Sequence, residues 1–157
     1  MDLILWRHAE AQELPPGDPR MCTDLERALT PRGEKQAARM AQWLDRQLPG
    51  SARILVSPAR RCEQTAHALG RKFKICSELA PGATAAQLLE LAQWPTGKSP
   101  VLVIGHQPTL GQAIAQLVGL QASDCALKKG ALWWLRSRER DGQGQTLVLS
   151  VQSPELL

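Results

Sequence analysis

Short apolar runs alternate along this chain with longer stretches whose apolar residues recur at helical spacing. The runs lie at residues 3–6, 53–56, 73–76 and 101–104, and two more follow at 131–135 and 146–151. Helical patterns cover residues 31–48, 58–69 and 84–94 and the stretch after Pro108. Strands that alternate with helices are typical of layered α/β folds. The sequence therefore predicts six strands and four helices, with the polar stretch 136–145 joining the last two strands.

Two predicted helices begin with a hydroxyl residue followed by proline. Thr30 precedes Pro31, and Ser57 precedes Pro58. Serine and threonine cap helix N-termini, and proline is favoured at the first helical position, so we expect helices to begin at these pairs. Gly70 predicts the end of the second helix. Residues 12–24 hold three prolines and a glycine and predict a loop.

Composition indicates one globular domain spanning residues 1–157. Hydrophobic residues make up 43% and charged residues 22% of the chain, which excludes intrinsic disorder. The net charge of +4 favours anionic ligands, but the basic residues are scattered among acids. Aromatic residues make up only 4%, too few for a base-stacking surface. We therefore expect no nucleic acid partner.

The cysteines do not predict a metal site or a disulfide framework. Cys22, Cys62, Cys76 and Cys125 lie far apart, with no Cys-x-x-Cys pair and no histidine at ligand spacing. The apolar run at the N-terminus is too short for a signal peptide or a membrane span. We expect a cytoplasmic monomer with reduced thiols that needs no metal, cofactor or membrane.

Histidines and arginines follow three of the predicted strands. Arg7-His8 comes after the first, residues 57–61 after the second, and Gly105-His106 after the run at 101–104. If these strands are parallel neighbours, their carboxyl ends place two histidines and at least two arginines around one crevice. A neutral imidazole is a nucleophile, and arginine neutralises phosphoryl oxygens with bidentate contacts. This combination favours phosphoryl transfer through a phosphohistidine.

Four motifs resemble, in order, those of the histidine phosphatase superfamily, which has the phosphoglycerate mutase-like fold. LILWRHAE, at residues 3–10, resembles the N-terminal Arg-His-Gly motif, with Ala9 in place of glycine. The other three are LTPRG at 29–33, SPARRCEQTA at 57–66 and VLVIGHQP at 101–108. Each motif is weak alone, but the ordered set is specific. The resemblance implies a three-layer α-β-α fold around a mostly parallel six-stranded sheet.

Within that superfamily, the short chain and its Arg-His-Ala variant resemble SixA-type phosphohistidine phosphatases. The resemblance implies that His8 is the nucleophile, and that Arg7, Arg61 and His106 bind the phosphoryl oxygens. Arg60 stands beside Arg61, and the sequence leaves open which of the two faces the phosphate. The resemblance also implies a protein substrate, a phosphohistidine on a histidine-phosphotransfer domain of a signalling relay.

Two other functions compete with this interpretation. One is hydrolysis of a small phosphomonoester, which needs a general acid for its alkoxide leaving group; Glu78 is the candidate. Because the P–N bond of phosphohistidine is labile, we do not include Glu78 among the catalytic residues. The other is a binding module that docks a phosphorylated partner without catalysis, for which a nucleophilic histidine would be unnecessary.

Several conspicuous residues receive a structural interpretation. We expect His67 to be a solvated helix residue and Cys62 to fill the core. Of Trp133 and Trp134, we expect one to face the core and the other to face outward. We expect Lys128 and Lys129 to be ordinary loop charges.

Overall fold

A six-stranded sheet with the order β3-β2-β4-β1-β5-β6 forms the centre of the computed structural model, which describes residues 1–13, 17 and 23–157. The strands are β1 (Asp2–Arg7), β2 (Arg53–Val56), β3 (Lys74–Ile75), β4 (Val101–Gly105), β5 (Leu132–Arg140) and β6 (Gln143–Gln152). The first four are parallel, and β5 is antiparallel to both β1 and β6. The mostly parallel sheet expected from the sequence is therefore confirmed.

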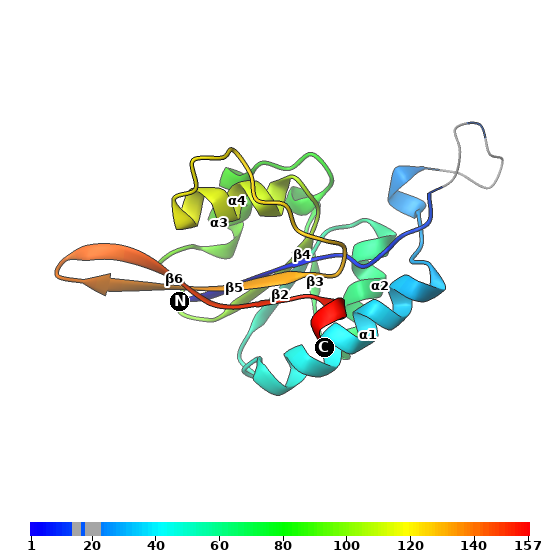
Figure 1. The fold of residues 1–157 in the computed structure, drawn as a ribbon, viewed down its shortest axis with the longest axis horizontal. Coiled ribbons are helices and arrows are strands. Elements are labelled where there is room, and N and C mark those ends of the chain that lie inside the picture. The colour runs from blue at the N-terminus through cyan, green and yellow to red at the C-terminus, as the bar shows by residue number, and fades with distance from the viewer. Residues whose placement is uncertain (14–16, 18–22) are drawn as a thin grey trace.

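Four helices cover the two faces of this sheet in pairs (Figure 1). They are α1 (Pro31–Gln47), α2 (Arg60–Leu69), α3 (Ala85–Ala92) and α4 (Thr109–Val118). Successive strand residues point to opposite faces. Ile4 and Trp6 accordingly lie in a core with α1 and α2, while Leu3 and Leu5 lie in a second core with α3 and α4. The expected three-layer α-β-α architecture is confirmed.

The helix starts agree with the sequence in one case and differ in the other. Thr30 caps α1 and accepts a hydrogen bond from the Gly33 amide, with Pro31 at the first helical position. The second helix begins at Arg60, not at Ser57-Pro58, and its N-cap is Ala59. The prediction was wrong because the Ser57 hydroxyl lies against the His106 ring, 2.7 Å from Nε2. Gly70 ends α2 in the left-handed conformation, as expected.

The last two strands are longer than predicted and form a hairpin that extends beyond the helical layers (Figure 1). Residues 136–145 were expected to be a connection, but nearly all of them pair between β5 and β6. The turn is Asp141-Gly142, with φ of 53° and 76°. Two positive φ values suit a tight hairpin turn, whose twist matches that of the strands. By contrast, β3 is shorter than predicted and has two residues instead of four.

The described residues also form three 3₁₀ turns, η1 (Asp24–Glu26), η2 (Ser77–Leu79) and η3 (Pro154–Leu156). Most of the loop predicted for residues 12–24, with Cys22, falls outside the described residues. Cys62 and Cys76 are buried free thiols, and Cys125 is a half-buried one. Within the described parts of the chain, no helix has both the length and the apolar character that crossing a membrane requires.

Candidate active site

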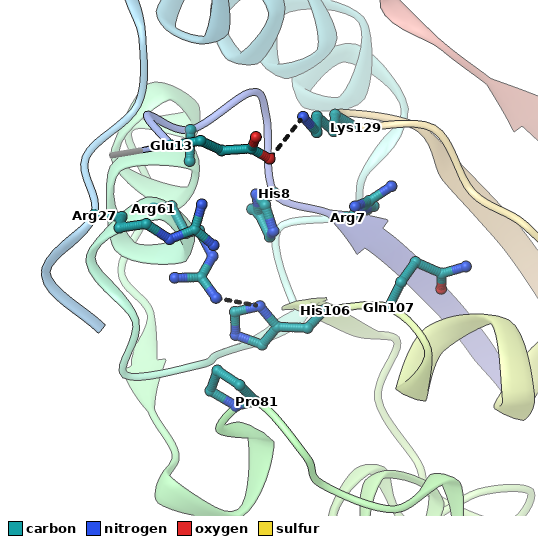
Figure 2. A pocket seen from close by; sticks show the side chains of 10 residues that line it. Arg7, His8, Glu13, Arg27, Arg61, Pro81, His106, Gln107 and Lys129 are labelled. Carbon is teal, nitrogen blue, oxygen red and sulfur yellow. Dashed lines mark hydrogen bonds and ion pairs between the residues drawn. The ribbon is translucent and has the colours of Figure 1, made fainter. Parts of the chain in front are cut away.

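The carboxyl ends of β1, β4 and β2 meet at one edge of the sheet. The His8 amide donates to the Gly105 carbonyl at 3.2 Å, and the Ser57 amide donates to the Ile104 carbonyl at 3.0 Å. A cavity of about 160 Å³ opens at this edge (Figure 2). It is lined by Arg7, His8, Ala11, Glu13, Arg27, Arg61, Pro81, His106, Gln107 and Lys129. The structure therefore brings together all four residues singled out in the sequence.

His8 is buried directly after β1, with its ring fixed by the backbone. Nδ1 lies 2.7 Å from the carbonyl oxygen of Ala9. Because a carbonyl only accepts, we assign the ring proton to Nδ1, which leaves a lone pair on Nε2. Burial first, and then the positive charges around the cavity, lower the pKa of His8 to about 3, although the hydrogen bond to Ala9 acts to raise it. The imidazole is therefore neutral at neutral pH and has a nitrogen available for attack.

Arg7 is the last residue of β1 and extends along the cavity wall. Its Nη1 donates to the Leu127 carbonyl at 2.6 Å. Its Nε is buried, and no residue that the structure describes accepts a hydrogen bond from it. Burial, and then the positive charge of Arg61, lower the pKa of Arg7. Such a crowded, partly unpaired guanidinium favours an anion beside it.

Arg61, not Arg60, belongs to the cavity. Arg61 lies in the first turn of α2 and is 3% exposed, whereas Arg60 points to solvent. Its Nη1 and Nη2 donate to the backbone carbonyl and the carboxylate of Asp24, at 2.8 and 3.1 Å. Its Nε is the second buried guanidinium nitrogen that lacks an acceptor among the described residues. Both arginines line the cavity, and their two positive charges favour an anion in it.

His106 follows β4, and its ring centroid lies 5.3 Å from that of His8. Its Nδ1 is 3.4 Å from Arg61 Nη2, which can only donate. We therefore assign the ring proton to Nε2, which donates to Ser57 Oγ at 2.7 Å. Burial first, and then the charge of Arg61, lower the pKa of His106 to about 4. This histidine is also neutral at neutral pH.

Three charged residues at the cavity were missed in the sequence. Arg27 lines it, and Lys129 forms a 3.9 Å ion pair with Glu13 (Figure 2). The interpretation of Lys129 as an ordinary loop charge is therefore wrong, because the chain after Leu127 returns past the end of β1. A signal for Arg27 existed, since Asp24 precedes it by three residues, a spacing at which side chains pair in a 3₁₀ turn.

The remaining conspicuous residues lie outside the cavity. Glu78 is exposed in η2, and its pKa is lowered by its own backbone amide and by the Ser77 hydroxyl. His67 is exposed on α2 and packs edge-on against Phe73. Cys62 is buried in the core, as expected, and burial raises its pKa to about 12.

The tryptophan pair differs from expectation. Trp134 packs in the core with α1 and α2, and the half-buried Trp133 packs against the core with α3 and α4. Neither faces outward alone, because each face of β5 is covered by a helical layer here.

As to metal ligands, the described residues contain no cluster of three or more histidine, cysteine, aspartate or glutamate side chains that could hold an ion.

The chain is similar to known proteins in both sequence and structure. Residues 3–84 match the histidine phosphatase superfamily (branch 1). A phosphohistidine phosphatase SixA homolog of Haemophilus influenzae is 30% identical over an alignment of 134 residues, gaps included, that covers 76% of this chain and 78% of that protein. Phosphohistidine phosphatase SixA of Escherichia coli is 32% identical over an alignment of 127 residues, gaps included, that covers 74% of each chain.

The fold comparison agrees with the sequence comparison. The structure of a protein histidine phosphatase SixA complexed with tungstate superimposes with a TM-score of 0.79 and 26% identity, covering 99% of both chains. A phosphoserine phosphatase of Entamoeba histolytica superimposes with a TM-score of 0.69 at 17% identity, over 99% of this chain and 98% of that one, and shows the shared fold alone.

Proposed function

The chain belongs to the histidine phosphatase superfamily and is a SixA-type phosphatase, and from this membership we propose that it removes phosphate from a protein phosphohistidine. In the proposed reaction His8 is the nucleophile, and Arg7, Arg61 and His106 hold the transferring group. The substrate would be a histidine-phosphotransfer domain of a signalling relay. The relatives named as phosphohistidine phosphatases support this choice of substrate class.

One observation carries the proposal: a neutral histidine faces an anion site. His8 keeps its Nε2 lone pair because Nδ1 is committed to the Ala9 carbonyl. Arg7 and Arg61 line the same cavity, and the Nε of each is buried without an acceptor among the described residues. A site that only bound phosphate would need the arginines but no nucleophile between them. The binding-module alternative is therefore less well supported.

The reaction would proceed in two displacements. Nε2 of His8 attacks phosphorus, the P–N bond of the substrate breaks, and the substrate imidazole takes a proton from water, which leaves hydroxide. A second water then attacks the phosphohistidine at His8 and gives up a proton that neutralises this hydroxide. The P–N bond at His8 breaks, which releases inorganic phosphate and restores the neutral ring with its Nδ1 proton. In both steps charge is spread over three phosphoryl oxygens, which the arginines stabilise by charge-assisted hydrogen bonds.

The position of Glu78 favours a P–N bond over an ester. A general acid must lie within hydrogen-bond reach of the leaving atom and be protonated at working pH. Glu78 is exposed, does not line the cavity, and has a lowered pKa. The leaving imidazole of a phosphohistidine needs less help from an acid than an alkoxide does. We therefore prefer phosphohistidine to a small phosphomonoester as substrate.

The shape of the chain around the cavity also suits a protein substrate. Between Gly70 and Val101 it forms only β3, η2 and α3. In this segment larger members of the superfamily often insert a cap over the site. A cavity without a cap would admit a phosphohistidine that projects from a folded domain.

A single-turnover trapping experiment tests the proposal. Wild type, His8→Ala and His67→Ala are mixed with a ³²P-labelled histidine-phosphotransfer domain, and protein label and free phosphate are followed over time. His67→Ala is the matched control because it removes an exposed histidine that does not line the cavity. We expect wild type and His67→Ala to release phosphate and to carry label transiently. We expect His8→Ala neither to release phosphate nor to become labelled.

Other outcomes would change the assignment in defined ways. Phosphate release by His8→Ala at the wild-type rate would exclude His8 as nucleophile. Release of phosphate from p-nitrophenyl phosphate but not from the labelled domain would favour the phosphomonoester alternative. Stable association with the labelled domain, without any release by wild type, would favour a binding module.

A further inference from the structure

One carboxylate joins two arginines of the cavity. Oδ2 of Asp24 accepts from Arg61 Nη2 at 3.1 Å, and Oδ1 accepts from Arg27 Nε at 3.0 Å. We propose that Asp24 is a positioning residue that holds Arg27 and Arg61 as one pair and thereby sets the affinity of the cavity for a phosphate-like dianion. The inference rests on the proposed function insofar as that function makes this cavity the phosphoryl site.

Local structure explains why Asp24 and Arg27 meet. Asp24 opens the 3₁₀ turn η1, and Arg27 is the residue that ends it. In a 3₁₀ helix, side chains three residues apart lie one above the other. Arg27 is fixed at its far end as well, because its Nη1 donates to the Gln12 carbonyl at 3.1 Å. The turn thus presents a carboxylate and a guanidinium together at the edge of the cavity.

Asp24 holds Arg61 by two contacts, while Nη2 of the same guanidinium also lies 3.4 Å from His106 Nδ1. Nη1 donates to the Asp24 backbone carbonyl at 2.8 Å, and Nη2 donates to its carboxylate. Two contacts to one residue fix the plane of a guanidinium. Asp24 itself does not line the cavity, whereas Arg27 and Arg61 do. The carboxylate therefore approaches the fork from outside and does not occupy the place of the phosphoryl group.

The charges of the cavity require such a residue. Arg7, Arg27 and Arg61 all line it, and the positive charge of Arg61 contributes to the lowered pKa of Arg7. Although partial burial acts to raise the pKa of Asp24, Arg61 and Arg27 keep it below its ordinary value, so the carboxylate is ionised. It offsets the repulsion between the two guanidinium groups. Its side chain is 55% exposed, so water partly screens its charge.

Anion binding by Asp24→Asn tests the proposal. Asparagine keeps the size of the side chain but removes the charge and one acceptor oxygen. The control is Glu26→Gln, which removes a charge from the same turn; among the described residues Glu26 has no hydrogen bond to either arginine. Titration calorimetry with tungstate, and separately with orthophosphate, should show binding about tenfold weaker in Asp24→Asn. The control should stay within about twofold of wild type.

A double variant separates positioning from a general loss of structure. If Asp24 acts through Arg61, Asp24→Asn should have little effect once Arg61 is removed. The double variant should therefore bind tungstate at most about twofold more weakly than Arg61→Ala alone, because only the contact of Asp24 with Arg27 is left to lose. Asp24→Glu, which retains the charge, should recover part of the lost affinity. A purely structural role would instead lower the unfolding midpoint of Asp24→Asn and give additive losses.

Two results would overturn the proposal. One is tungstate binding by Asp24→Asn that equals or exceeds that of wild type, since this would show that the carboxylate competes with the anion. The other is full additivity in the double variant. Both readouts use inorganic anions only. If wild type binds tungstate, Asp24→Asn binds it weakly, and no phosphohistidine is hydrolysed, the substrate assignment fails while the role of Asp24 stands.

Discussion

The two histidines of the cavity are held by different kinds of group. His8 is held by the backbone: Nδ1 donates to Ala9, the amide donates to Gly105, and the carbonyl accepts from Gly130. His106 is held by side chains, since its ring lies between Ser57 Oγ and the Arg61 guanidinium. Arg61 is in turn held by Asp24.

This difference predicts how each wall of the cavity responds to mutation. We call His8 and its backbone partners the His8 wall, and His106 with Ser57, Arg61 and Asp24 the His106 wall. Backbone donors and acceptors are present whatever the side chains are, so the His8 wall should change only when the backbone moves. The His106 wall depends on a series of side chains, so single substitutions should alter it in steps. The proposed nucleophile thus has the more robust support, and the proposed oxyanion-binding groups have the more adjustable one.

The largest expected effect comes from Arg61→Ala, which removes the central side chain of the His106 wall. The substitution deletes a buried guanidinium that contacts both His106 and Asp24. We expect kcat/KM to fall by about a hundred- to a thousandfold, as for loss of one donor to a developing oxyanion. The measurement is steady-state phosphate release from a phosphorylated histidine-phosphotransfer domain.

Arg60→Ala is the matched control for Arg61→Ala. Arg60 has the same charge and is the neighbouring residue in α2, but it points to solvent. We expect its kcat/KM to stay within about twofold of wild type. Equal losses in the two variants would show that net charge, not the buried contact, determines the rate.

The second effect tests the backbone wall through Gly33→Ala. A Cβ at Gly33 would collide with the Glu10 carbonyl, which also accepts from the Thr30 amide. The collision would displace the loop that carries the Ala9 carbonyl, and with it the acceptor of His8 Nδ1. We expect a loss of about 3 kcal/mol in the free energy of unfolding, at the upper end for overpacking. Urea denaturation measures it.

Gly50→Ala provides the comparison for Gly33→Ala. A Cβ at Gly50 would meet no atom within 4 Å. We expect its free energy of unfolding to change by less than about 0.5 kcal/mol. If Gly33→Ala were equally harmless, the close approach of α1 to the loop after His8 would not be what holds that wall.

The third effect concerns both walls and depends on pH. The pKa values of His8 and His106 are lowered to about 3 and about 4, whereas the unfolded chain has ordinary histidines near 6.5. Below pH 6.5 the unfolded state therefore binds protons that the folded state does not, so stability falls as pH falls toward 4. Between pH 7 and pH 5 we expect a loss of about 2 kcal/mol for each histidine.

Substituting one histidine at a time separates the two contributions. Urea denaturation of His106→Asn at pH 7 and pH 5 should show about half the wild-type loss, because only His8 of the buried pair remains. A wild-type stability that does not change between these pH values would contradict burial of two neutral rings. The same low pKa values predict that kcat/KM shows no decline near pH 6.5 from protonation of His8.

The convergence of the four residues could be predicted because it follows from strand polarity. Arg7-His8 and Gly105-His106 stand directly after apolar runs, and parallel strands bring such positions to one edge. Arg27 and Lys129 were not predicted as cavity residues, because their approach depends on how η1 and the chain after Leu127 fold back. The local spacing of Asp24 and Arg27 indicates that these two side chains pair, but the approach of Arg27 and Lys129 to the cavity is set by tertiary structure.

The errors in secondary structure have the same origin. Residues 136–145 are polar on both faces because the hairpin they form extends past both helical layers, so no apolar alternation marks it (Figure 1). The Asp141-Gly142 pair was the available signal. At Ser57-Pro58 a helix-capping pattern predicted a start that the structure places later, since the hydroxyl bonds to a histidine far along the chain.

The smallest effect is expected for Ser57→Ala, which removes the hydroxyl that pairs with His106 Nε2. The buried Ser57 hydroxyl accepts from His106 Nε2–H and also from the Ala59 amide. A hydroxyl can donate as well as accept, so it can pair with either neutral tautomer of the imidazole. The Ser57 hydroxyl would therefore let the ring proton of His106 move from Nε2 to Nδ1. Nδ1 could then donate to a phosphoryl oxygen while Nε2 accepts from the Ser57 hydroxyl. Alanine removes this freedom, and we expect kcat/KM to fall by about tenfold.

Ser77 provides the control for Ser57→Ala, and His106 provides the coupling test. Ser77→Ala removes an exposed hydroxyl outside the cavity and should leave the rate within about twofold of wild type. In a His106→Ala background, Ser57→Ala should cost nothing further, because its partner is gone. A full tenfold loss in that background would mean that Ser57 acts through Ala59 and the start of α2. The His106 wall would then be supported by the backbone, as the His8 wall is.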